Sequence, residues 1–452
     1  MESTVTVEGR PGSPEGKETQ KDPGVFGEEA IRIARRILGS FLAGYRGRAE
    51  IRLWDGSTVA GGEGALCVLV FKDPSPIRSL ALHPDIVRLA EAYLAGEVEV
   101  YGDMEAALDL VEFILKKRKP PLSEHLRILG QALRMPSGEG AGVVRSVRAG
   151  RRKRRNSRAS IAHHYDVGDD FYRLWLDPEM VYSCAYFRDS GQSLAEAQRD
   201  KLDYICRKLR LEPGQSLLDI GCGWGALVLW AARYYGVSAH GITLSERQYE
   251  YARKRVRDEG FEGRVRIDLR DYRDLPQDAA YDRVVSVGMF EHIGIANFPA
   301  YFGAVSRVLK PGGLFLNHGI SSREGLKNTP LTRFINRYVF PDGELARISD
   351  VVDAMEKAGF EILDVEGLRR HYAMTLRHWV RALESRRKEA VKVAGEVIYR
   401  LWRLYMSGYA YYFERGDVGV YQVVAGHAGQ PLFTPLRRDD IYRDAAGSGA
   451  GR

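Results

Sequence analysis

The chain has 452 residues, with 67 Lys and Arg against 60 Asp and Glu and a formal net charge of +7. An apolar fraction of 44% with 10% aromatic residues excludes wholesale disorder, and the length predicts two or three domains. Four Cys, none in a C-x-x-C pair, exclude a disulfide framework and a structural zinc site. We therefore expect reduced thiols, a cytoplasmic protein and no metal. No run approaches the roughly 20 apolar residues of a membrane-spanning helix.

The N-terminal part predicts a disordered leader over 1–25 and a small α+β domain over 26–130. The elements of this domain are a helix over 26–42, two strands around an Asp55-Gly56 turn, a strand over 67–73 and largely helical sequence over 84–117. The domain carries no cluster of Cys, His or carboxylates that suggests chemistry. We therefore expect it to have a binding or structural role.

A basic linker is predicted over 131–158. Its part over 145–158 holds eight basic residues and no acidic one, so the rest of the chain has a net charge of 7 − 8 = −1. A solvated linker, a nucleic-acid arm and a contact for anionic lipid head groups all fit such a run. Composition alone does not choose among the three.

Strands and helices alternate over 159–440, which predicts an α/β domain with a parallel, doubly wound sheet. The expected strands are 216–220, 237–243, 264–269, 283–287 and 313–318. A helix is expected over 226–235, and Ser245 with Gln248 matches a capping box for the next helix. The last residues, 441–452, predict a disordered tail.

A glycine loop follows the first of these strands, with Asp219, Gly221, Gly223 and Gly225 in the order D-x-G-x-G-x-G. Its spacing differs from the G-x-G-x-x-G of dinucleotide-binding proteins, and the second strand ends without the acidic residue that holds an NAD ribose. A zwitterion such as S-adenosylmethionine fits better, because it has no pyrophosphate. Further polar pairs follow later strands at the same carboxyl edge of the sheet: Asp271-Tyr272 and Glu291-His292.

These residues resemble the cyclopropane-fatty-acyl-phospholipid synthase family of S-adenosylmethionine-dependent methyltransferases. The matching stretches, in the family's order, are 163–177, 181–187, 218–225, 241–248, 288–294 and 337–345. Residues 26–130 are similar to the lipid-associated domain that bacterial members carry. The resemblance implies an enzyme with a Rossmann-like domain, peripheral at the inner membrane surface.

The resemblance also implies site residues. Cofactor contacts would come from Tyr182, Ser183, Gly221, Gly223, Thr243, Leu244, Gln248, Asp271 and Tyr272. A bicarbonate ion, the base of the family, would be held by the Cys184 amide, Glu291, His318, the Ile320 backbone and Tyr372. Tyr409 stands where many members have a Cys, so we expect no nucleophile there, and the chemistry requires none.

The implied reaction is attack of a cis double bond of an unsaturated membrane phospholipid on the sulfonium methyl. This leaves a carbocation, and proton loss closes a cyclopropane. Aromatic faces would exclude water and stabilise the cation, and we single out Tyr182 and Tyr372 because both belong to motifs.

Three other functions fit parts of the sequence. Loss of a different proton would give a methylene branch, later reduced to a methyl branch. N-methylation of a small amine fits the fold but not the N-terminal domain. The glycine loop and the bicarbonate set argue against a nucleic-acid-binding protein. We therefore expect an anionic membrane surface as partner, no nucleic acid, and a homodimer from resemblance alone.

Overall fold

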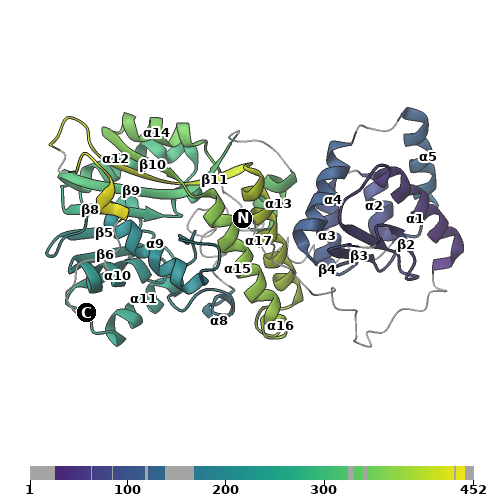
Figure 1. Cartoon of the computed structure of the whole chain (residues 1–452), viewed down its shortest axis with the longest axis horizontal. Coiled ribbons are helices and arrows are strands. Elements are labelled where there is room, and N and C mark those ends of the chain that lie inside the picture. Colours follow the sequence, from purple (N-terminus) through teal and green to yellow (C-terminus); the bar gives the residue numbers. More distant parts are fainter. Residues whose placement is uncertain are drawn as a thin grey trace, which may run out of the picture. The chain divides into compact units, whose positions relative to one another are not determined.

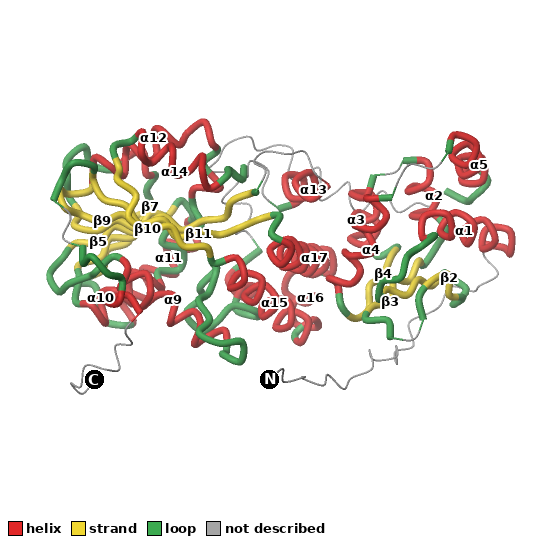
Figure 2. Tube along the Cα trace, turned by 45° about the horizontal axis from the view of Figure 1, so that its top comes forward, coloured by secondary structure: helices red, strands yellow, loops and turns green. Residues whose placement is uncertain are grey.

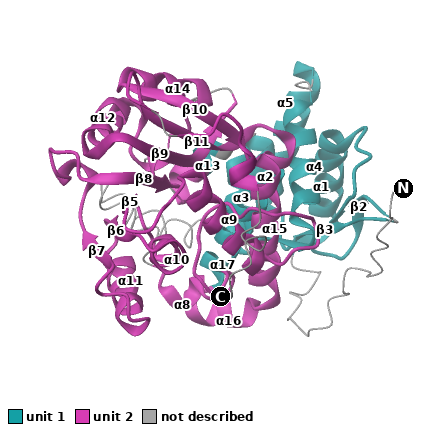
Figure 3. Ribbon diagram, turned by 60° about the vertical axis from the view of Figure 1, so that its left-hand side comes forward, with its two compact units in different colours: residues 1–153, 329–334, 396–411 teal, residues 154–328, 335–395, 412–452 magenta. Residues whose placement is uncertain are grey.

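The computed structural model describes residues 26–62, 64–83, 85–117, 121–137, 167–323, 330–339, 344–431 and 434–442. The chain divides into two compact units, coloured separately in Figure 3. Unit 1 comprises residues 1–153, 329–334 and 396–411, and unit 2 comprises the remaining residues. The predicted leader, the basic run over 145–158 and the residues from 443 onward lie outside the described residues.

Unit 1 is built on a four-stranded sheet in the order β2-β1-β3-β4 (Figure 1). Its strands are β1 (Ala49–Arg52), β2 (Thr58–Ala60), β3 (Cys67–Phe71) and β4 (Val98–Gly102). Its helices are α1 (Gly27–Leu42), α2 (Ser75–Leu82), α3 (Ile86–Ala95), α4 (Met104–Lys116) and α5 (Leu122–Leu133). The predicted hairpin forms, since β1 and β2 pair antiparallel. Strand β4 interrupts the segment that the sequence predicted as largely helical.

Two segments from the range predicted as one domain, 159–440, group with unit 1. Residues 396–411 belong to α17 (Glu396–Arg415), whose arginines bind the edge strand β4. Arg400 donates to the Glu99 carboxylate at 2.6 Å, and Arg403 donates to the carbonyls of Val100 and Gly102 at 2.9 and 2.8 Å. Buried arginines therefore attach this late helix to an early sheet, a pairing that sequence order does not reveal.

Unit 2 is an α/β domain whose sheet has seven strands in the order β10-β11-β9-β8-β5-β6-β7. The strands are β5 (Ser216–Ile220), β6 (Ser238–Thr243), β7 (Val265–Leu269), β8 (Tyr281–Val287), β9 (Leu309–Ser322), β10 (Phe360–Gly367) and β11 (Val418–His427). The α-helices are α8 (Asp169–Tyr172), α9 (Leu194–Lys208), α10 (Ala226–Tyr235), α11 (Glu246–Asp258), α12 (Phe298–Val308), α14 (Ile348–Lys357), α15 (Arg369–Ser385), α16 (Arg387–Ala394) and α18 (Asp439–Tyr442). The 3-10 turns are η2 (Tyr272–Asp274), η3 (Phe290–His292) and η4 (Ile295–Asn297), and α13 (Pro330–Tyr338) begins in unit 1 and ends in unit 2.

Helices cover both faces of this sheet, as the doubly wound prediction requires. Figure 2 shows α12 and α14 on one side and α9 and α10 on the other. Neighbouring residues of one strand point to opposite sides, so Leu217 joins the core under α9 and α10, while Leu218 joins the core under α12. Both leucines are fully buried.

The sheet departs from the prediction in two places. Strand β11 runs antiparallel to β9 and to β10, so the sheet is mixed rather than wholly parallel. The predicted strand 313–318 begins earlier, at Leu309, and Lys310-Pro-Gly-Gly forms a bulge inside β9, since Tyr281 pairs with Leu309 and Arg283 already pairs with Leu314. In the described part of the chain, no helix is long and apolar enough to cross a membrane.

Gly241 of β6 allows the glycine loop to pack against the sheet. A Cβ atom at Gly241 would lie 2.8 Å from both Cβ and Sγ of Cys222, so Gly241→Ala is expected to lower the free energy of unfolding by about 1–3 kcal/mol. Denaturant unfolding would measure this. Gly263→Ala is the control, because a Cβ there meets nothing within 4 Å. Adding Cys222→Gly to Gly241→Ala should recover part of the loss, and strictly additive losses would contradict the packing argument.

Candidate active site

A cavity of about 200 Å³ lies in unit 2 at the carboxyl ends of β5, β6 and β8. Ten of the predicted cofactor residues line it: Tyr182, Ser183, Asp219, Gly221, Gly223, Thr243, Leu244, Gln248, Asp271 and Tyr272. They come from four separate stretches of the chain. The sheet therefore brings together the residues that the motifs selected, with the exception of Gly225.

The glycine loop is folded back on β6 by two backbone bonds. The amides of Gly221 and Cys222 donate to the Ile242 carbonyl at 2.9 and 3.0 Å. Gly221 and Gly223 have φ of +89° and +55°, and a Cβ on Gly223 would meet open space. Gly225 has a different role. It starts α10 with φ of +85°, and a Cβ there would lie 3.1 Å from the Ala252 Cβ, so it serves helix packing rather than the ligand.

Asp219 lies one residue before the end of β5, next to this loop, and is 2% exposed. Burial raises the pKa of its carboxyl to about 7, against the opposing charge of Lys201. Its Oδ1 makes no hydrogen bond within the described structure. An acceptor with an unused oxygen on the cavity wall suits the ammonium group of a zwitterionic ligand.

The end of β6 positions Gln248. The Thr243 hydroxyl donates to Gln248 Oε1 at 3.0 Å, and the Ser245 hydroxyl accepts from the Gln248 amide N–H at 3.4 Å. The second half of the predicted capping box is therefore wrong. The Gln248 side chain accepts a hydrogen bond from Thr243 and does not bind the backbone N–H of Ser245.

The adenine side of the predicted site is held by local bonds. Asp271 caps η2 by accepting from the Arg273 amide at 2.9 Å, and it also pairs with the Arg273 guanidinium at 2.6 Å. The Tyr272 ring meets the buried Tyr301 ring edge to face, with centroids 5.2 Å apart. The predicted pair therefore stands on a fixed turn at the cavity rim.

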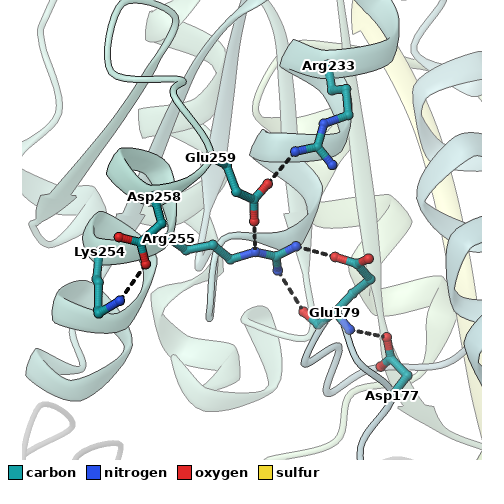
Figure 4. A network of polar contacts seen from close by, with 7 residues as sticks. All are labelled: Asp177, Glu179, Arg233, Lys254, Arg255, Asp258 and Glu259. Carbon is teal, nitrogen blue, oxygen red and sulfur yellow. Dashed lines mark hydrogen bonds and ion pairs between the residues drawn. The ribbon is translucent and has the colours of Figure 1, made fainter.

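A charged network fixes the loop that leads to Tyr182 and Ser183 (Figure 4). Arg255 of α11 pairs with the Glu179 carboxylate and donates to the Glu179 carbonyl at 3.1 Å. Glu259 accepts from Arg255 Nε at 2.5 Å, and the Asp177 carboxylate accepts from the Glu179 amide at 2.9 Å. These bonds attach the loop to α11, the helix whose first turn contains Gln248.

Aromatic rings gather around Tyr182. Its ring centroid lies 5.7 Å from that of Tyr172, 5.5 Å from Trp175 and 5.2 Å from Trp379. Trp379 also packs on Tyr372, with centroids 6.1 Å apart. The sequence selected Tyr182 and Tyr372, and the structure adds Trp379, which contacts both rings, and Trp175, which packs on Tyr182 and Trp379.

The predicted bicarbonate residues fall into two groups. In the first, Glu291 Oε1 accepts from the Ile320 amide at 2.6 Å, so this amide serves Glu291. His318, two residues earlier on β9, shares a 3.2 Å bond between its Nδ1 and Gln422. Glu291 Oε2 and His318 Nε2 have no partner among the described residues. Burial raises the pKa of Glu291 to about 7, while burial and the nearby charges of Lys201 and Lys208 lower the pKa of His318 well below its usual value.

In the second group, Cys184 lies along the start of α15. Its thiol is 3.8 Å from the Leu368 carbonyl, and the neighbouring Ala185 amide donates to the Thr375 hydroxyl at 3.0 Å. Tyr372 lies on the first turn of the same helix. Burial raises the pKa of the Cys184 thiol, so it is no nucleophile at neutral pH. Tyr409 belongs to the α17 segment of unit 1, where its ring packs on Tyr405.

Lys201 belongs to none of the predicted site residues, yet it lines the cavity from α9 and is 2% exposed. Its Nζ donates to the Ser183 hydroxyl at 2.8 Å. A signal was present, because Lys201 follows Ala197 and precedes Ile205 at intervals of four residues, on the apolar face of the helix. A lysine is almost never fully buried unless a partner accompanies its charge.

Comparisons with known proteins agree with this fold. Residues 152–423 match the family model described as mycolic acid cyclopropane synthetase, and residues 41–124 match a domain of unknown function. A probable fatty acid methyltransferase of Pseudomonas putida is 41% identical over 400 residues, which are 87% of this chain and 96% of the relative. The cyclopropane-fatty-acyl-phospholipid synthase of Escherichia coli K12 is 41% identical over 261 residues, 58% of this chain and 66% of the relative. A structure of mycolic acid cyclopropane synthase CmaA1 complexed with SAH and CTAB aligns with a TM-score of 0.57 at 34% identity, over 61% of this chain and 99% of that one.

The buried Glu291 carboxyl makes stability depend on pH. Folding raises the pKa of Glu291 from 4.5 to about 7, because the folded protein holds this proton more tightly than the unfolded chain does. The contribution of the protonated carboxyl to the free energy of unfolding is therefore fully present below pH 4.5 and is lost as pH rises toward 7. Glu291→Gln should therefore gain stability relative to the parent across this window, by up to about 1.4 kcal/mol per pH unit. Denaturant unfolding from about pH 5 to about pH 8 measures the difference.

Glu262→Gln, at an exposed position, is the control for the Glu291 experiment, and its difference from the parent is expected to stay constant over the same range. If the Glu291→Gln difference is equally flat, Glu291 does not titrate as a buried group.

Proposed function

Because the chain belongs to the mycolic acid cyclopropane synthetase family, and is therefore an S-adenosylmethionine-dependent methyltransferase, we propose that it methylates the cis double bond of an acyl chain in a membrane phospholipid and closes a cyclopropane ring. One observation carries the proposal. The Glu291 carboxyl is held by the Ile320 amide with one oxygen unused, in the unit where aromatic rings surround Tyr182.

S-adenosylmethionine, when bound, supplies a methyl group that its sulfonium makes electrophilic. The residues that would hold it are the ten that line the cavity, with Asp219 as acceptor for the ammonium group. Buried side chains, among them Asp219, Thr243 and Gln248, form part of the wall, which favours a ligand held away from water.

The proposed reaction leaves positive charge on the acyl chain, and the rings of Tyr182, Trp175 and Trp379 are suited to stabilise it. Aromatic faces attract cations through their quadrupole and exclude the water that would quench them. Two of these rings are 1% exposed, those of Trp175 and Trp379. This cluster supports chemistry through a cation.

The closing step needs a base near the reacting carbon, and bicarbonate is the proposed one. A Glu291 with pKa about 7 can keep its proton and share it with the ion in a hydrogen bond, where an ionised carboxylate would repel the ion. His318 is neutral because its pKa is lowered, and its Nε2 has no partner among the described residues, so it can take part in a hydrogen bond to the same ion. The Cys184 amide and Tyr372 would complete the set.

A branched product is the second candidate. The relative from Pseudomonas putida carries the wider description of a probable fatty acid methyltransferase. The same cation would lose a different proton to give a methylene group, and a separate reductase would then give a methyl branch. The residues in the site serve either outcome.

Lipid mass spectrometry of a host that expresses the chain tests the function. We expect unsaturated acyl chains to gain one CH2 unit, and NMR of the product to separate ring from branch. Glu291→Gln should lower turnover by about 10²–10⁴-fold, because it cannot exchange the proton, while S-adenosylhomocysteine binding stays within about threefold. No gain of CH2 with the parent chain, or full activity of Glu291→Gln, would contradict the proposal.

We also propose that the enzyme works at an anionic membrane surface and forms a homodimer, which analytical ultracentrifugation would measure. Two features support membrane contact. The run over 145–158 holds eight basic residues, and three leucines of α5 stand exposed: Leu122 at 73%, Leu126 at 59% and Leu133 at 65%. Exposed apolar side chains and a basic sequence both suit a lipid head-group region.

Neutralising four arginines of the basic run, Arg151, Arg152, Arg154 and Arg155, should weaken binding to anionic vesicles at least about tenfold, since each nearby basic residue contributes about 1 kcal/mol before screening. Vesicle sedimentation at low and high salt measures this. Zwitterionic vesicles and duplex DNA are the controls, and neither should show comparable binding. Unchanged binding to anionic vesicles would return the run to the role of a solvated linker.

A further inference from the structure

Lys201 is a buried cation without a carboxylate partner. Within the described structure, its Nζ makes one hydrogen bond, to the Ser183 hydroxyl, and no ion pair. Lys208 lies seven residues along the same helix and is equally buried, yet it pairs with Asp364 at 3.3 Å and Glu366 at 2.5 Å. An ammonium group taken out of water is costly unless an anion accompanies it. Lys208 has two carboxylates within ion-pair distance, whereas Lys201 has none that close among the described residues and interacts with Asp177 and Asp219 only from farther away.

Lys201 lines the cavity and has N–H donors that a ligand there could use. An ammonium group has three N–H donors, and Lys201 uses one of them on Ser183. The Ser183 hydroxyl accepts that bond, so its own proton is available for donation. Both residues line the cavity, and the pair therefore offers it N–H and O–H donors from one place.

The opposite charge stands on the same cavity. Asp219 lines it and has a buried Oδ1 with no partner among the described residues. Lys201 and Asp219 interact electrostatically without forming an ion pair, since each shifts the pKa of the other. A cavity with an unused donor group and an unused acceptor group matches a ligand that carries both a carboxylate and an ammonium group.

We propose that Lys201, together with Ser183, binds a carboxylate-type oxyanion in the active site. The assignment rests on the proposed function, which supplies two such anions: the amino-acid carboxylate of S-adenosylmethionine, and bicarbonate. Position favours the first, because Lys201 and Ser183 share the cavity wall with the glycine loop. Bicarbonate is the other source, since the charge of Lys201 also reaches Cys184 and His318.

The charge state of Lys201 agrees with this role. Burial lowers its pKa to about 8, while Asp177, Cys184 and Asp219 raise it, so the side chain is mostly protonated at neutral pH. A bound oxyanion would raise this pKa further and hold the cation charged.

A ligand pair tests the proposal by isothermal titration calorimetry. S-adenosylhomocysteine has the carboxylate, and its decarboxylated analogue, 5′-deoxy-5′-(3-aminopropylthio)adenosine, lacks it. With Lys201→Met, we expect S-adenosylhomocysteine to bind about 10–100-fold more weakly and the analogue to change by less than about threefold. Lys208→Met is the matched control, because it removes a buried lysine of the same helix outside the cavity, and its affinity for both ligands should stay unchanged.

The remaining results of these titrations either support or overturn the proposal. Unchanged binding of both nucleosides, with a several-fold higher bicarbonate concentration for half-maximal turnover, would support the oxyanion role with bicarbonate as the source. Equal weakening of both nucleosides, or no change in either measurement, would overturn it. If Lys201→Met does not fold, the parent protein decides, since equal affinity for the two nucleosides would overturn the carboxylate assignment. A parent that binds neither nucleoside would instead contradict the proposed function.

Discussion

The site depends on ionisable groups that the fold keeps out of water. Asp219, Lys201, Glu291 and His318 are all at most 6% exposed, and burial is the largest cause of the pKa shift of each. Burial moves every one of them toward its neutral form. A carboxyl that keeps its proton near neutral pH can donate, and an imidazole that stays uncharged can accept. The same apolar surroundings would protect a cation on an acyl chain from water, so one constraint serves acid–base chemistry and substrate protection together.

That constraint explains why the loop before Tyr182 is so firmly held. The network of Arg255, Glu179 and Glu259 ties it to α11. Past Tyr182, Gln198 binds the Ser183 carbonyl at 2.9 Å and Thr375 accepts from the Ala185 amide at 3.0 Å. One short stretch thus connects the cavity, the aromatic cluster and α15. Buried charges interact strongly enough that a small displacement of this stretch would change their protonation.

Much of this was predictable from the sequence because it is local. Strand 216–220, helix 226–235 and the glycine loop each follow from neighbouring residues, and the parallel topology then places Glu291 and Asp271 at one edge. The remainder depends on contacts between distant segments. Strand β11 lies between β10 and β9 and runs antiparallel to both, and nothing in its own residues encodes that direction. Trp175 and Trp379 lie far apart in the chain and meet only in the folded unit.

Lys201 shows most clearly why residue type alone misleads. The periodicity of α9 places Lys201 and Lys208 on the same apolar face, and by sequence they are equivalent. The difference arises from their surroundings. β10 supplies Asp364 and Glu366 to Lys208, whereas the space beside Lys201 is a cavity. A buried lysine whose charge is already neutralised contributes to structure, and one whose charge is not is prepared for a ligand. The feature that indicates function at this position is therefore the lack of an ion-pair partner among the described residues, and not the lysine itself.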